Sequence, residues 1–224
     1  MKHDELTRLW NEVDAIAALK RSARRERLDR VIETIRLRPD ATSDPEALYI
    51  TAYCRYLHPT RLDSHQGRLE FERSMYAVLD VEPQHVQAKL YLAFHYFDIG
   101  EWEQAKRWCD AVDVSKLTPD SRVKIGELKL CLDLRDIGLE GALGELGEFV
   151  AECLREDEFD ILPVHLMALL PKVASEAVRH DVVERASQLV HDLVAHTHQE
   201  NLFAKELAAL EELCNSPGAP SHAR

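Results

Sequence analysis

Apolar residues recur three or four positions apart along most of this 224-residue chain, which is the spacing of a helix with one buried face. This spacing predicts an amphipathic helix from Asp4 to Lys20 and a second from Leu28 to Leu37, which would pair as a hairpin before Pro39. Strict alternation of apolar and polar residues is rare, and the strong helix formers Ala, Leu, Glu and Arg are abundant. The pattern predicts an all-α fold without a sheet.

Clusters of turn-forming residues separate the next helices. Residues 39–45 hold two prolines, two aspartates and a serine, and they predict a helix over 46–57 with Asp44 as its cap and Pro45 in its first turn. Residues 58–64 predict a longer loop, an insertion between two helices, whose serine caps the helix that follows.

The tripeptide Asp-Ile-Gly occurs at 98–100 and again at 136–138, each time between two stretches of helical periodicity. Each copy predicts a helix stop, because glycine accepts left-handed backbone angles. Helices are therefore expected from about 119 to 135 and from there to Leu154. The glycines at 141, 144 and 147 either weaken the second of these helices, by up to about 1 kcal/mol each, or permit close helix contact.

The C-terminal part keeps helical periodicity without this tripeptide. It predicts a helix over 164–170 that Pro171 interrupts, followed by helices over 173–178, 182–194 and 202–213. Residues 159–214 are interpreted as a helical cap, and the segment 215–224, which contains Pro, Gly and Ser, as a disordered tail.

The segment 72–119 has the most specific pattern: a helix with a small residue near a Tyr, a glycine turn, then a helix with an aromatic and a small residue. The residues concerned are Ala93, Tyr96, Gly100, Trp102 and Ala105. Together with the preceding helix end at Pro83, they resemble a tetratricopeptide repeat, a 34-residue helix-turn-helix unit. Lys89 departs from the family pattern where a Trp is usual, and Leu117 where a Pro is usual.

The resemblance implies a right-handed stack of helical hairpins, an α-solenoid, forming one domain over 1–214 with an N-terminal hairpin at 1–39 and repeats at 44–158. In that family the first helices of successive repeats line a concave groove that binds a partner protein or peptide. The residues that the resemblance places there are Gln87, Leu90, Phe94, Phe97, Asp98, Leu128, Leu132 and Arg135.

Two of these residues, Leu90 and Phe94, stand where family members that clamp a peptide carboxylate carry Lys or Asn, so the groove is expected to be apolar. Burial of the apolar members against a neighbouring repeat is an equally good interpretation. Tyr91 and Trp108 are assigned to the core between repeats.

The chain carries 28 Lys and Arg against 40 Asp and Glu, a net charge of −12 at pH 7. This disfavours nucleic acid or an anionic membrane as the main partner and favours a basic protein, unless the charge serves solubility alone. The expected function is a non-enzymatic adaptor, a chaperone, or a dedicated inhibitor such as an immunity protein that neutralises a basic toxin. A homo-oligomer is compatible with the sequence. Residues 20–38 form a basic island, with eight basic and three acidic groups, interpreted as a solvated face or an intramolecular contact.

The five cysteines are widely spaced, and no pair has the spacing of a zinc or redox motif, so they are interpreted as core residues in a reducing compartment. The first residues lack the apolar core of a signal peptide, and the most apolar run, 161–170, is too short to cross a bilayer. A cytoplasmic location is expected.

A phosphate-binding glycine loop, a serine nucleophile elbow and a Cys/His constellation are all missing from the sequence, so neither catalysis nor a cofactor is expected. The alternative is a helical metal-dependent hydrolase built on the C-terminal pairs His180-Asp181 and His191-Asp192, with His196 and His198 nearby. Offsets of five and seven residues along one helix turn His196 away from the other two histidines, so a metal site is not expected.

Overall fold

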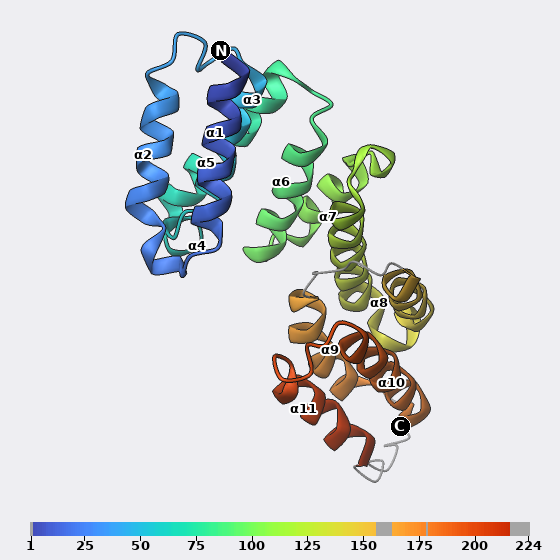
Figure 1. Ribbon diagram of the computed structural model, residues 1–224. Coiled ribbons are helices and arrows are strands. Elements are labelled where there is room, and N and C mark those ends of the chain that lie inside the picture. The colour runs from blue at the N-terminus through green and yellow to red at the C-terminus, as the bar shows by residue number, and fades with distance from the viewer. Residues whose placement is uncertain (1, 156–162, 178, 216–224) are drawn as a thin grey trace. The chain divides into compact units, whose positions relative to one another are not determined.

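The computed structural model describes residues 2–155, 163–177 and 179–215. Within these ranges the protein consists of eleven α-helices and two 3-10 turns, without a strand, so the prediction of an all-α chain is confirmed (Figure 1). The chain divides into two compact units, unit 1 at 1–113 and unit 2 at 114–224. The predicted repeat segment 44–158 includes residues of both units.

Unit 1 contains seven of the α-helices and one 3-10 turn, η1, at Arg21–Ala23. The helices are α1 Lys2–Ala17, α2 Arg25–Arg36, α3 Pro45–Leu57, α4 Thr60–Asp63, α5 His65–Val81, α6 Val86–Asp98 and α7 Trp102–Ala111. Aliphatic side chains from α1, α2 and α3 form a common core that includes Leu9, Val13, Leu28 and Ile50. Helix α3 also packs on α5, and α6 packs on α7.

The start of α3 has the predicted cap. A carboxylate oxygen of Asp44 accepts the backbone N–H groups of Glu46 and Ala47, at 3.0 and 3.4 Å, and Pro45 is the first helical residue. These contacts satisfy two of the N–H groups that a helix start leaves without a partner in the helix.

The short helix α4 lies inside the segment that the sequence predicted as a loop, so that prediction is corrected at 60–63. Ser64 caps α5 as predicted, since its hydroxyl accepts the N–H of Gly67 at 3.0 Å. A side chain at Gly67 would have no room, because its Cβ would lie 2.2 Å from the carbonyl oxygen of Thr60. Glycine therefore lets the backbones of α4 and α5 approach closely.

The turn between α6 and α7 ends at Gly100, which has a φ of 83°. Its N–H donates to the carbonyl of Phe97 at 3.1 Å, and the next N–H, of Glu101, donates to Tyr96 at 2.8 Å. This is the Schellman arrangement of a helix end, and it confirms the stop predicted at the first Asp-Ile-Gly tripeptide. Two small residues, Ala93 and Ala105, are buried in the α6–α7 pair.

In the described part of unit 2 there are a 3-10 turn, η2, and four α-helices. They are η2 Val114–Lys116, α8 Pro119–Arg155, α9 Val164–Glu176, α10 His180–His196 and α11 Ala204–Asn215. α8 is interrupted at Gly138, where φ is 71° and ψ is 177°, so it comprises two helical halves. The second Asp-Ile-Gly tripeptide therefore also stops a helix, as predicted.

Pro171 does not interrupt its helix, and this prediction was wrong: α9 runs continuously from Val164 to Glu176. A proline inside a helix removes one backbone hydrogen bond. Residues on both sides of it, Met167, Leu170 and Ala174, are buried, so apolar burial of one continuous helix face offsets that loss.

Two carboxylates of α8 cap the helices that pack on it. The buried Glu127 accepts the backbone N–H groups of His165 and Leu166 at the start of α9, at 2.9 and 3.0 Å. Glu140, in the other half of α8, accepts the N–H of Arg179 just before α10, at 2.8 Å. A carboxylate is favourable at both places, because a helix start carries a partial positive charge.

All five cysteines are free, and four of them are buried: Cys54, Cys109, Cys131 and Cys153. Burial raises the pKa of the Cys54 and Cys153 thiols to about 12, so they stay protonated and unreactive at neutral pH. The prediction of core cysteines is confirmed for these four, whereas Cys214 is partly exposed. Among the described helices, none combines the length and the apolar character needed to cross a membrane.

The predicted disordered tail lies outside the described residues except for Asn215, which ends α11.

Candidate binding groove

The residues predicted to line a concave groove lie on α6 and α8, which belong to different units. Four of these residues are buried: Leu90, Phe94, Leu128 and Leu132. Partly exposed members are Gln87, Phe97 and Asp98, and Arg135 is exposed. The ring of Phe97 packs edge-on against Trp102, with centroids 5.1 Å apart. Whether a partner contacts these residues stays a prediction.

A different surface of unit 1 is hollowed. A groove of about 630 Å³ is lined by residues of α5, by the end of α6 and by α7, and it is named the α5–α7 groove here. Its lining comes from side chains spaced three or four residues apart, so one face of α5 and one face of α7 supply most of it.

Three aromatic side chains form one wall of the α5–α7 groove. The hydroxyl groups of Tyr76 and Tyr96 lie 3.0 Å apart, and the rings of Tyr76 and Trp108 have centroids 6.0 Å apart. Tyr76 is 39% exposed, and Trp108 is partly exposed. Burial, and next the hydrogen bond with Tyr76, raise the pKa of Tyr96, so its hydroxyl stays neutral. The wall offers apolar area together with a pair of hydroxyl groups.

The charged groups of the groove are Arg68 and Glu72 on α5, Glu101 beside α7 and Arg107 on α7. Arg107 donates to Gln104 at 3.3 Å, and Arg68 donates to the carbonyl of Leu62 at 3.3 Å. The Nε of Arg68 is buried without a hydrogen-bond partner among the described residues. An N–H group that is buried without a partner costs free energy, so a ligand that accepts a hydrogen bond from this nitrogen would remove that cost.

Glu72, which lines the groove, also belongs to a network of buried polar side chains. The side chain of His95 is fully buried; its Nε2 lies 3.0 Å from a Glu72 oxygen, and its Nδ1 lies 3.3 Å from a guanidinium nitrogen of Arg61. Because a guanidinium only donates, Nδ1 is the acceptor and Nε2–H donates to Glu72. Burial lowers the pKa of His95, the hydrogen bond with Glu72 opposing this, so the imidazole is neutral at pH 7.

Arg61 anchors the same network from the inserted helix α4. It pairs with Asp98 at 2.8 Å, donates to the carbonyl of Tyr56 at 2.9 Å, and lies over the Tyr56 ring at 4.2 Å from the centroid. Asp98, which the sequence placed on the predicted groove, thus holds the insertion onto α6. The network joins α4, α5 and α6 and holds Glu72, one of the groove residues, in place.

The basic island at 20–38 is tied to the rest of unit 1. Arg24 donates to backbone carbonyls at the end of α1 at 2.7 and 2.9 Å, and the buried side chain of Arg38 pairs with Glu5 at 2.8 Å and Asp40 at 3.1 Å. For Arg24 and Arg38, these contacts confirm the interpretation that residues of the island make intramolecular contacts.

The histidines considered for a metal are not grouped. His180 lies 3.2 Å from Glu184, and His191 lies 3.4 Å from Glu211. Over the described ranges, no three or more His, Cys, Asp or Glu side chains converge so that they could hold a metal ion. The hydrolase alternative therefore has no specific observation in its favour. Asp181 lies in the first turn of α10.

Sequence reasoning missed the α5–α7 groove, although its spacing was visible. Arg68, Glu72 and Tyr76 are four residues apart on α5, and Gln104 and Trp108 are four apart on α7, so each set shares one helix face. The contact of Arg61 with His95 carries no comparable signal, because the two residues are 34 positions apart.

No family model, no curated protein and no solved structure matches this chain.

Proposed function

We propose that this protein is a non-enzymatic binding module that holds a partner protein in the α5–α7 groove, on a scaffold of stacked hairpins similar to tetratricopeptide repeats. The observation that carries the proposal is the groove itself. It combines a volume of about 630 Å³, an aromatic wall with the partly exposed Tyr76 and Trp108, and a buried network that fixes its base. Aromatic and arginine side chains of this kind contribute most to binding energy in protein interfaces.

Two helix pairs support the repeat scaffold. α6 packs on α7 around Ala93 and Ala105, α3 packs on α5, and the Asp-Ile-Gly tripeptide ends a helix in both units. The proposed surface lies on the second helices of these pairs, α5 and α7. We propose it in place of a groove on the first helices because four of the five apolar residues predicted there are buried: Leu90, Phe94, Leu128 and Leu132.

A basic partner fits the net charge of −12, since opposite charge accelerates encounter and suppresses wrong partners. A dedicated inhibitor of a basic protein, such as an immunity protein for a toxin, is the form that this charge favours over an adaptor or a chaperone. The site of action proposed for it is the cytoplasm.

The test is in-cell photo-crosslinking from a benzoylphenylalanine placed at Gln104, inside the groove. One dominant crosslinked protein is expected, and Trp108→Ala should lower its yield at least about five-fold, the effect of losing a central aromatic contact. Leu37→Ala is the matched control, because Leu37 is an apolar residue 73% exposed at the end of α2, outside the groove. An unchanged yield in Trp108→Ala, or an equal loss in Leu37→Ala, would refute the groove as the binding surface.

A further inference from the structure

The α5–α7 groove has charged groups of both signs in equal number. Two guanidinium groups, of Arg68 and Arg107, and two carboxylates, of Glu72 and Glu101, belong to its lining. Unit 1 as a whole is also close to neutral, with 20 acidic and 17 basic residues, whereas unit 2 has 20 acidic and 11 basic residues. The charge that favours a basic partner is therefore concentrated in unit 2, and the groove itself favours an uncharged segment of that partner.

Hydrogen-bond donors accompany the aromatic rings of the groove. Trp108 makes no hydrogen bond within the described ranges, so its indole N–H is free to donate. The hydroxyl groups of Tyr76 and Tyr96 lie 3.0 Å apart; one donates to the other, which leaves one O–H of the pair for another acceptor. Gln104 accepts from Arg107 through its side-chain oxygen and keeps its NH₂ group available.

The remaining polar groups of the groove add further donors and one acceptor. Arg68 uses one of its guanidinium nitrogens, to donate to the carbonyl of Leu62. Glu72 already pairs with the N–H of His95, so Glu101 is the carboxylate of the groove that remains open. Donors thus outnumber acceptors, which matches a ligand backbone with carbonyl groups and few N–H groups.

The polyproline II conformation has this chemistry. It makes no internal hydrogen bonds, so its carbonyl groups are available to a partner, and each proline lacks the backbone N–H. Proline rings also pack on aromatic side chains, which is how proline-rich segments bind aromatic-lined grooves. The lining on α5 runs from His65 to Tyr76, which at about 1.5 Å per residue is a length of about 16 Å. A polyproline II segment rises about 3.1 Å per residue, so about five residues span this length.

We infer that the α5–α7 groove binds a proline-rich segment of about five residues of the partner protein, in the polyproline II conformation. Its proline rings pack on Tyr76 and Trp108, and its carbonyl groups accept hydrogen bonds from donors such as the indole N–H of Trp108. The inference rests on the proposed function, because it names the segment that occupies the same groove.

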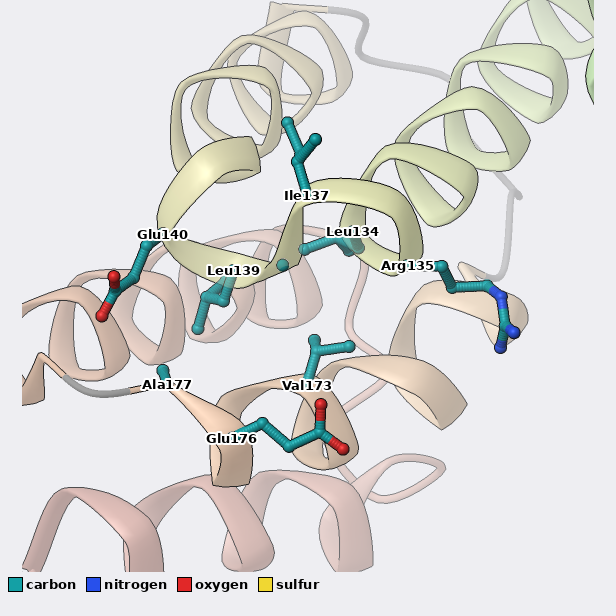
Figure 2. A pocket seen from close by; sticks show the side chains of 9 residues that line it. Leu134, Arg135, Ile137, Leu139, Glu140, Val173, Glu176 and Ala177 are labelled. Atoms are coloured by element: carbon teal, nitrogen blue, oxygen red, sulfur yellow. The ribbon is translucent and has the colours of Figure 1, made fainter. Parts of the chain in front are cut away.

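A pocket of unit 2 offers an internal comparison. Its volume is about 260 Å³, and Figure 2 shows the side chains that line it. None of these lining residues is aromatic, and the charged ones are Arg135, Glu140 and Glu176. A proline-rich segment should therefore leave this pocket unoccupied, and the amide resonances of Leu139 and Ala177 at its lining report on non-specific binding.

The experiment is a titration of the isotope-labelled full chain with a hexaproline peptide that is acetylated and amidated at its ends, followed through the indole N–H resonance of Trp108. A saturable shift with a dissociation constant of the order of millimolar or lower is expected, because the peptide is already ordered before it binds. A glycine–serine hexapeptide has the same number of carbonyl groups but loses chain freedom on binding, so it should bind at least about ten-fold more weakly. Leu139 and Ala177 should not shift.

Trp108→Phe keeps an aromatic ring in the groove and removes its N–H. It should weaken hexaproline binding about five-fold, the effect of one hydrogen bond, as measured at the amide resonance of Gln104. The matched control is Trp10→Phe, the same change on α1, where the indole N–H donates to Glu46. Shifts that do not saturate, equal binding of the two peptides, or an equal effect of the two variants would overturn the inference.

A second measurement separates this inference from the proposed function: mapping, by mass spectrometry, of the partner residue that is crosslinked from Gln104. Attachment within or next to a proline-rich segment is expected. If the crosslink forms at a segment without proline and hexaproline does not bind, the groove stands as a protein-binding surface and the inference is wrong. If hexaproline binds as expected while no crosslink forms, the proposed function fails and the groove remains a site for proline-rich segments.

Discussion

The two units differ in the kinds of residues that they contain. Unit 1 holds 12 of the 15 aromatic residues, including every Trp and Tyr, and it carries a net charge of −3. Unit 2 holds three aromatic residues, all Phe, and a net charge of −9. Unit 1 buries polar side chains such as Arg61 and His95 among its rings, whereas the core of unit 2 is mainly aliphatic and its carboxylates, the buried Glu127 among them, cap helices.

For the proposed binding function, this difference predicts a division of roles between the two units. A buried network in which each polar group has a partner holds a unique arrangement, so unit 1 is suited to present a shaped, specific groove. Unit 2, with its acidic surface, is suited to attract a basic partner over a longer range. Variants that affect one unit and spare the other test this division.

The largest effect is expected at Gly67, in unit 1. Gly67→Ala would place a Cβ 2.2 Å from the carbonyl oxygen of Thr60, a backbone atom that cannot rotate away. Separating α4 from α5 disturbs the contacts of Arg61, so we expect the free energy of unfolding to fall by about 3 kcal/mol. Urea denaturation measures the loss, and hydrogen exchange should locate it in α4 to α6. A stability within about 0.5 kcal/mol of the wild type would contradict this tight packing.

The next effect is expected at Glu127, in unit 2. Glu127→Ala would leave the N–H groups of His165 and Leu166 without their buried acceptor, which should lower the free energy of unfolding by about 2–3 kcal/mol. Faster hydrogen exchange is expected at the start of α9. Glu140→Ala is the control, since Glu140 is exposed and caps one N–H, and its loss should be about 1 kcal/mol or less. Equal losses in the two variants would argue against burial as the cause.

Acid should lower the stability of unit 1, because three of its histidines resist protonation in the folded state. Burial is the main cause that lowers the pKa of His58, His85 and His95 below the ordinary value of 6.5. As pH falls below about 6.5, the unfolded chain binds protons that the folded unit still excludes, so stability declines toward acid. For His95 the neighbouring charges are Arg61, Glu72 and Asp98.

The measurement is the free energy of unfolding between pH 7.5 and 5.5, in the wild type and in His95→Gln. The variant should be less stable at pH 7.5 but should depend less on pH, because it lacks one of the titrating groups. If acid stabilises the wild type over this interval, the direction of these pKa changes is wrong.

The sequence predicted those parts of the fold that local chemistry determines. The Asp44 and Ser64 caps and both Asp-Ile-Gly stops depend on residues within five positions of each other, and all are found in the structure. The helix break predicted at Pro171 was wrong, although the prediction rests on a local rule. Burial of Leu170 and Ala174 favours a continuous helix there.

The candidate sites were less accessible to prediction, because they depend on contacts between distant residues. Periodicity identifies Phe94 as apolar but does not distinguish a groove wall from a core position, and the side chain is only 6% exposed. The networks of Arg61 with His95 and of Glu127 with Leu166 join residues 34 and 39 positions apart, which no local pattern encodes.

The smallest effect is expected at Gly144, on the exposed side of the second half of α8. Among the residues that the structure describes, none lies within 4 Å of a Cβ placed there, so Gly144→Ala should raise the free energy of unfolding by about 0.5–1 kcal/mol through helix propensity alone. Gly138→Ala is the contrasting control and should destabilise, because its φ is 71°. A gain at Gly144 together with weaker partner crosslinking would show that this glycine serves close contact with the partner. A loss of stability would instead mean that another helix packs against it.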